Sequence, residues 1–167
     1  MDTRAAELAR ALGDADSEAT ALFNVADTAH AAGDIETADV NYRRALAHDG
    51  FAFDFKCLLG LAFLHGQRGE VDQARALFER CIDRCRERMS AGASSYLAFT
   101  LALALLGRGE VEQALQAFSA ALQIDHSPGA IQAALMDIEV LQRSRSPVAG
   151  VDAAVALLRR ALPAGST

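Results

Sequence analysis

Apolar and small residues recur at helical spacing along most of the chain, and short polar stretches separate them. Three of these stretches share one pattern, in which a glycine is followed by an acidic residue, an apolar residue and, three positions later, an alanine. They begin at Gly33, Gly69 and Gly109. An aromatic residue comes four positions after each alanine, and a further small residue three positions after that: Tyr42, Phe78 and Phe118, then Ala45, Cys81 and Ala121. The pattern predicts pairs of antiparallel helices, each joined at its glycine.

The glycine and the acidic residue have separate roles in this prediction. Glycine adopts the left-handed conformation that ends a helix without a Cβ penalty, so we expect positive φ at all three glycines. The acidic residue precedes the next helix, where the macrodipole favours negative charge.

The pattern resembles the tetratricopeptide repeat, a helical hairpin of about 34 residues. Aligned on the glycines, the three units cover residues 19–52, 55–88 and 95–128. Every position at which that family carries a small residue is small here: Ala26, Ala62, Ala102, Ala38, Ala74, Ala114, Ala45, Cys81 and Ala121. The bulky first-helix positions of the family fit less well, with Leu22, Leu58 and Ala98 in place of Trp. The resemblance implies an all-α superhelix and says little about the partner.

The rest of the chain is interpreted as additions to this solenoid, within one domain of residues 1–167. Residues 1–16 are expected to form a capping segment, with a helix over 2–13 and Asp16 or Ser17 as the N-cap of the next helix. Residues 129–162 are expected to form a degenerate fourth pair, with helices over 129–142 and 151–162, before a tail at 163–167.

Two further segments depart from the regular pattern. Forty residues separate the second and third glycines, so the second helix of the second repeat is expected to extend from 71 to about 89. Phe51, Phe53 and Phe55 alternate between the first and second repeats, and we expect a loop or helix start whose rings fill that junction rather than a strand.

Charge and cysteine content bear on the class of partner and on the cellular compartment. The net charge is −6, and residues 1–50 hold ten acidic and four basic residues. Because no part of the chain is strongly basic, we expect no nucleic-acid partner. Three cysteines without a C-x-x-C pair fit a reduced, cytoplasmic protein. Residues 89–107 lack charge, but they contain the first helix of the third repeat, so no membrane insertion is expected.

Candidate chemistry is sparse, and the sequence predicts no enzyme, cofactor or metal site. Cys81 and Cys85 lie one helical turn apart, but no histidine has the spacing to complete a zinc site, so Cys81 is interpreted as a small buried residue. Arg80, Arg84 and Arg88 share one helix face. They could bind an acidic partner, although pairing with the interleaved acids Glu79, Asp83 and Glu87 is favoured.

The resemblance also implies a binding site, because the first helices of the family line a concave groove that holds a peptide. The matching residues predicted to bind a peptide are Phe23, Asp27, Lys56, Leu59, Phe63, Tyr96, Phe99 and Leu103. Only Lys56 suits the polar clamp by which one subfamily holds a carboxylate. The alternative is that the terminal helices or a second copy of the chain cover these side chains.

The sequence therefore predicts a non-enzymatic interaction scaffold whose groove binds an apolar peptide or helix of a protein partner. Two alternatives remain: a bacterial secretion-type chaperone, which the chain resembles in length and repeat number, and a self-associating module that forms a homo-oligomer.

Overall fold

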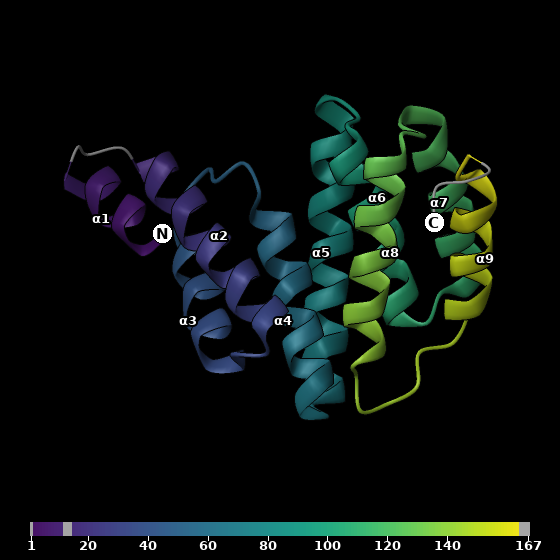
Figure 1. Ribbon diagram of the computed structural model, residues 1–167, viewed down its shortest axis with the longest axis horizontal. Coiled ribbons are helices and arrows are strands. Elements are labelled where there is room, and N and C mark those ends of the chain that lie inside the picture. Colours follow the sequence, from purple (N-terminus) through teal and green to yellow (C-terminus); the bar gives the residue numbers. More distant parts are fainter. Residues whose placement is uncertain (1, 12–14, 164–167) are drawn as a thin grey trace.

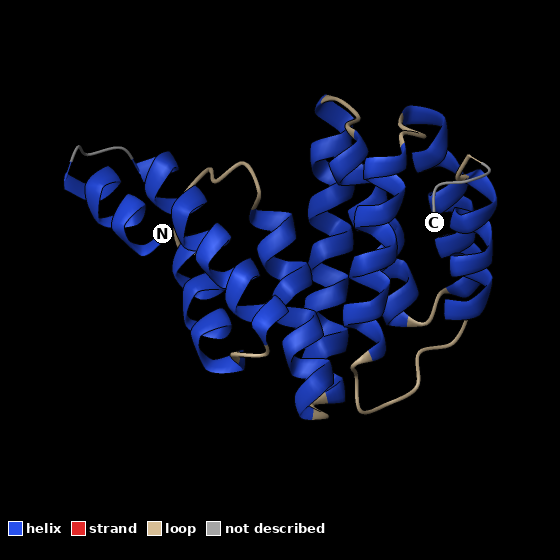
Figure 2. Ribbon diagram, viewed as in Figure 1, coloured by secondary structure: helices blue, strands red, loops and turns tan. Residues whose placement is uncertain are grey.

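The computed structural model describes residues 2–11 and 15–163, and every regular element within them is an α-helix (Figures 1 and 2). The helices are α1 (Asp2–Ala11), α2 (Ala15–Ala32), α3 (Ile35–Leu46), α4 (Asp54–Arg68), α5 (Val71–Ala91), α6 (Ser95–Arg108), α7 (Val111–Ile124), α8 (Pro128–Gln142) and α9 (Val151–Ala161). Helices α2 to α7 pack in three successive pairs, each against the next. The predicted all-α superhelix is confirmed.

The three predicted turns have the expected backbone geometry. Gly33, Gly69 and Gly109 have φ of 82°, 79° and 90°. In each case the amide of the following residue donates to a carbonyl five positions earlier, as Glu70 N–H does to His65 O at 2.9 Å. This bond satisfies a carbonyl that the helix end would otherwise leave without a partner.

Two other glycines allow neighbouring repeats to approach closely. A Cβ at Gly60 in α4 would lie 2.5 Å from the Tyr42 ring of α3, and one at Gly107 in α6 would lie 2.3 Å from the Phe78 ring of α5. The aromatic residue of one repeat thus packs on a bare helix backbone of the next repeat. The sequence pattern did not predict these two contacts.

The junction between the first two repeats is a loop filled by aromatic rings, as expected. Phe51 packs with the first repeat, and Phe55 packs with the second and third. The Phe53 ring lies between them, with centroids 6.0 Å from Phe51 and 6.3 Å from Phe55.

Arg84 and Arg88 of α5 pair mainly with a residue on another helix, and not with the interleaved acids of α5 as the favoured interpretation expected. Arg88 Nε donates to Asp54 Oδ1 at 2.9 Å, and its Nη2 donates to the Phe51 carbonyl at 2.7 Å. Arg84 Nη1 lies 3.2 Å from Asp54, and its contact with Glu87 is longer, at 3.6 Å. The main partner is therefore an aspartate at the start of α4, because the extra turns of α5 reach the loop before that helix.

At the N-terminus, one expected boundary is wrong. Helix α2 already includes Ala15, so Asp16 and Ser17 lie in its first turn and neither is the N-cap. Acidic residues are favourable there because they face the positive end of the helix dipole. The expected helix end at 12–13 lies outside the described residues. Among the helices that are described, none combines the length and the apolar character needed to cross a membrane.

Candidate functional site

Helix α8 lies along the concave face of the solenoid, where it contacts both α6 and α4 (Figure 1). In a regular fourth repeat, the first helix would pack mainly against α7. Here α9 packs against α7 instead. Ser127 caps α8 by accepting the Ala130 amide at 3.3 Å, and Pro128 occupies its first turn. The apolar stripe of α8, formed by Ile131, Ala134, Ile138 and Leu141, is buried in the same core cluster as α4 and α6.

This placement determines how much of the predicted groove is accessible. Leu59, Phe63, Phe99 and Leu103 are buried in one cluster with α8, each at most 7% exposed. Phe23 and Lys56 are partly buried, whereas Asp27 and Tyr96 are exposed. The eight predicted residues therefore divide into an apolar set that is buried with α8 and a set still reachable from solvent.

Lys56 of α4 and Asp137 of α8 form an ion pair at the centre of the concave face, with Nζ 3.4 Å from Oδ2. Burial raises the pKa of Asp137 above its usual range, nearby Asp27 adds to this shift, and Lys56 opposes it. Two cavities share this pair in their lining. The pair thus holds α8 against α4 at the point where packing on either side is incomplete.

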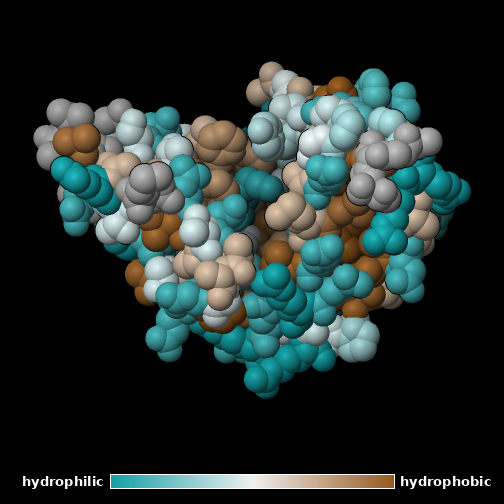
Figure 3. All heavy atoms as spheres, viewed as in Figure 1, coloured by the Kyte–Doolittle hydropathy of each residue, from teal (hydrophilic) through white to brown (hydrophobic). Residues whose placement is uncertain are grey.

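The first cavity, here named the α2–α8 cleft, has a volume of about 150 Å³. Apolar groups from both helices line it, including Phe23 and Ala31 from α2 and Met136 and Val140 from α8. Its charged residues are Asp27, Asp137 and Glu139 against Lys56 and Arg143. Figure 3 shows this face of the molecule hollowed between the first repeat and the C-terminal helices.

A chain of polar contacts fixes the α2 wall of the cleft. The Tyr42 hydroxyl donates to Asp27 Oδ1 at 3.1 Å and lies 3.5 Å from His30 Nδ1. Gln67 Nε2 lies 3.1 Å from the other ring nitrogen of His30. Burial lowers the pKa of His30, so the neutral ring is favoured. The network fixes the orientation of the Asp27 side chain, and Asp27 remains exposed at the cleft.

The second cavity, of about 340 Å³, lies between the start of α6 and the first half of α8. Tyr96, Phe99 and Thr100 line it from α6. Thr100 is 1% exposed, and its hydroxyl has no hydrogen-bond partner among the described residues. A buried hydroxyl without a partner is costly, so Thr100 lowers the stability of this wall.

The buried thiols of α5, Cys81 and Cys85, contact each other and the backbone of α4. Cys81 is fully buried, and its Sγ donates to the Phe55 carbonyl at 3.3 Å. A hydrogen bond with Cys85, together with burial, raises the pKa of Cys81. Across the described ranges, no group of three or more His, Cys, Asp or Glu side chains is placed to hold a metal ion.

The repeat geometry agrees with the comparison to known families. Residues 57–80 and 95–119, which lie in the second and third helical pairs, match the family model described as tetratricopeptide repeat. These two segments are similar to the tetratricopeptide repeat, which supports the resemblance found in the sequence. Tetratricopeptide repeats generally mediate protein–protein interactions. No curated protein matches the chain significantly.

Sequence reasoning missed the part of the site that α8 and its C-cap contribute, chiefly Met136, Asp137 and Arg143. Their positions relative to α4 depend on how α8 folds back over the earlier repeats, and the tetratricopeptide pattern does not encode this. One signal was present: Asp137 immediately precedes Ile138 of an otherwise apolar stripe. A charge at that position suggests a partner in the fold, but not which one.

Proposed function

We propose that this helical repeat protein is a non-enzymatic scaffold that binds an amphipathic helix of a partner protein in the α2–α8 cleft. The observation that carries the proposal is that α8, a largely apolar helix, lies on the concave face with its apolar stripe buried. The unoccupied part of that face, beside α8, combines apolar walls with exposed polar edges. A second helix laid next to α8 would continue the same mode of packing.

Met136 is the residue most suited to contact such a helix. It lines the cleft and is 66% exposed, although methionine packs well against irregular apolar surfaces. Phe23, Asp27 and Lys56 from the sequence-predicted set lie on the opposite wall and floor. Leu59 and Phe63 also line the cleft but are largely covered, so they support its floor and offer little area to a partner.

The charges of the cleft favour an apolar mode of binding. Its three acids and two bases nearly cancel, and Lys56 and Asp137 already pair with each other. We therefore expect the affinity for a partner helix to depend only weakly on salt.

A test can use helical peptides selected from a display library against the full chain. Selected peptides should carry apolar residues at i, i+3 or i+4, and i+7. Met136→Glu should weaken their binding about tenfold or more, because it places a charge at an apolar contact. Val40→Glu is the matched control, since Val40 on α3 is 56% exposed and does not line the cleft. This variant should bind normally.

Three outcomes would contradict the proposal. Selection could yield no helical binder, Met136→Glu could bind as tightly as the native chain, or both variants could lose binding equally. Light scattering on the same variants tests self-association. An oligomer that Met136→Glu dissociates would show that a second copy of the chain occupies the cleft.

A further inference from the structure

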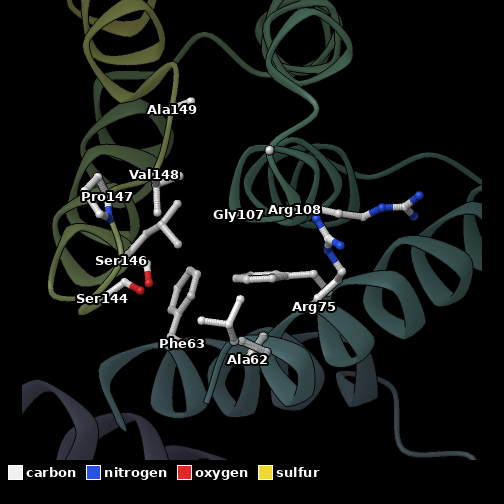
Figure 4. Close-up of a pocket in the computed structure, with 16 residues that line it drawn as sticks. Ala62, Phe63, Arg75, Gly107, Arg108, Ser144, Ser146, Pro147, Val148 and Ala149 are labelled. Atoms are coloured by element: carbon white, nitrogen blue, oxygen red, sulfur yellow. The ribbon is translucent and has the colours of Figure 1, made fainter. Parts of the chain in front are cut away.

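A third cavity, of about 230 Å³, is lined at one edge of the solenoid by the C-terminal ends of α4 and α6 and the start of α5 (Figure 4). Helices α4, α5 and α6 form its floor and one side. Residues 143–150, here named the α8–α9 loop, contribute its other walls. None of the residues predicted to bind a peptide lines this cavity except Phe63.

The cavity exists because the α8–α9 loop is anchored near both ends and arches between them. Near its start, Arg145 N–H donates to the Gly66 carbonyl of α4 at 3.1 Å. At its end, Gly150 packs so closely on α7 that a Cβ would lie 2.5 Å from Val111. Ser146 to Ala149 cross the gap between these anchors and line the cavity without filling it. An apolar void under such an arch lacks packing contacts, so a ligand that fills it gains them.

The floor of the cavity is aromatic and apolar. The rings of Phe63 and Phe78 meet at its base, with centroids 6.1 Å apart and planes at 61°. Both residues are buried, and Ala62, Ala74 and Leu141 complete the apolar lining. The volume exceeds the roughly 150 Å³ of an engineered apolar cavity that binds benzene, so one ring or a branched aliphatic group fits.

The charge at the cavity is entirely positive. Arg75 and Arg108 line it, and no lining residue is acidic. Arg108 is already paired, with Nε 2.8 Å from Glu110 and Nη1 3.6 Å from Glu79. Arg75 has no ion pair within the described structure, and in Figure 4 it lies on the opposite side of the cavity from Ser144 and Ser146. A guanidinium without an ion pair suits a carboxylate, which accepts from its N–H groups.

We propose that this cavity binds a carboxylate attached to a single aromatic or branched apolar group. The apolar group occupies the space over Phe63 and Phe78, and the carboxylate pairs with Arg75 at the mouth. Such an acid occurs either as a small free molecule or as the C-terminal residue of a protein chain. This cavity shares the buried Phe63 with the lining of the α2–α8 cleft, and the proposal does not rest on the function proposed for that cleft.

The test is an NMR titration of the full chain with matched pairs of probes. The small probes are 3-phenylpropionate, its primary amide and acetate. The peptide probes end in phenylalanine with a free or an amidated C-terminus. 3-Phenylpropionate should shift the amide signals of Gly107, Gly109, Ser146, Val148 and Ala149. The amide, which lacks the charge, and acetate, which lacks the ring, should each bind at least about fivefold more weakly.

Two variants isolate the contribution of the guanidinium. Arg75→Gln keeps a polar, hydrogen-bonding side chain and removes the guanidinium and its charge, and it should weaken 3-phenylpropionate binding about fivefold or more. Arg80→Gln, on the same helix and outside the cavity lining, should leave that binding unchanged. Both side chains are exposed, so the variants should fold like the native chain.

The peptide probes distinguish the two sources of the carboxylate. Binding of the free-carboxylate peptide but not its amide supports a protein C-terminus, whereas binding of 3-phenylpropionate alone supports a small molecule. The proposal is overturned if no probe shifts these signals at millimolar concentration. It is also overturned if acid and amide bind equally, or if Arg75→Gln binds like the native chain.

Discussion

At the residue scale, Asp137 shows how much one side chain depends on its surroundings. On an isolated α8 it would be an ordinary solvated carboxylate. Against α4 it loses water, gains Lys56 at 3.4 Å and faces the field of Asp27 from α2. The loss of water outweighs the attraction of the lysine, because the net effect is a raised pKa.

This pKa predicts how Asp137 affects stability at different pH. A raised folded-state pKa favours the protonated form on folding, so the associated stability is present at acidic pH and is lost as pH rises through the folded-state pKa. The side chain at this position is neutral at every pH in Asp137→Asn, so this variant should not lose stability in this way as pH rises. The free energy of unfolding of Asp137→Asn, relative to the native chain, should therefore increase between about pH 4 and about pH 7 in urea titrations.

Asp125→Asn is the control with the opposite sign. The Ser127 amide donates to Asp125 at 2.9 Å and lowers the pKa of that carboxyl, so its stabilising effect is present above the usual carboxyl range and is lost as pH falls. The free energy of unfolding of Asp125→Asn relative to the native chain should decrease as pH rises. A relative stability of Asp137→Asn that falls with pH would mean that attraction to Lys56 dominates.

At the scale of elements, the length of α5 has a structural consequence. Its C-terminal half carries Arg84 and Arg88 to the loop that joins the first and second repeats. There the two arginines bind Asp54, and Arg88 also binds the Phe51 carbonyl. This half of α5 thus stabilises the junction at which the aromatic rings of Phe51, Phe53 and Phe55 meet.

We predict that Arg88→Ala destabilises the fold by about 2 kcal/mol, because it removes two charge-assisted hydrogen bonds and leaves the largely buried Asp54 with fewer partners. Arg80→Ala is the matched control two turns earlier on the same helix. Arg80 is exposed and has no ion pair within the described residues, so its loss should change stability by less than about 0.5 kcal/mol. Chemical denaturation measures both values. Equal effects of the two substitutions would show that the contact with Asp54 contributes little.

At the scale of the whole molecule, the apolar core is divided into two clusters. One lies within the first repeat and along one face of α4. The other runs through α4 to α9, and Leu46, Phe53 and Leu77 pack against both. Since α8 and α9 fold back on the later repeats, the C-terminal part has packing from sequence-distant helices that the first repeat lacks.

This division predicts uneven stability along the solenoid. Amide hydrogens of α2 and α3 should exchange with deuterium before those of α6, because repeat proteins can open locally from an end that has few neighbours. Hydrogen-exchange mass spectrometry under native conditions measures the order. Protection that is uniform from α2 to α7 would mean that the three rings at the junction couple the two clusters into one cooperative unit.

The sequence by itself determined the repeats, because their signals are local. Gly69 ends a helix by its own φ preference, and small residues such as Ala62 and Ala74 mark where two backbones approach, so spacing alone locates the helical pairs. The sequence also placed Phe23 and Asp27 on one face of α2, because residues on a helix keep a fixed angular relation.

Only the tertiary structure decided which part of the concave face remains accessible. Whether Leu59 and Phe99 meet solvent depends on where α8 packs, and α8 is joined to the third repeat by a short link that permits several directions. Its apolar stripe could have faced α7, as in a regular repeat, or α4 and α6. The stable arrangement is the one in which many weak contacts together bury the most apolar surface. No single residue of α8 determines that total.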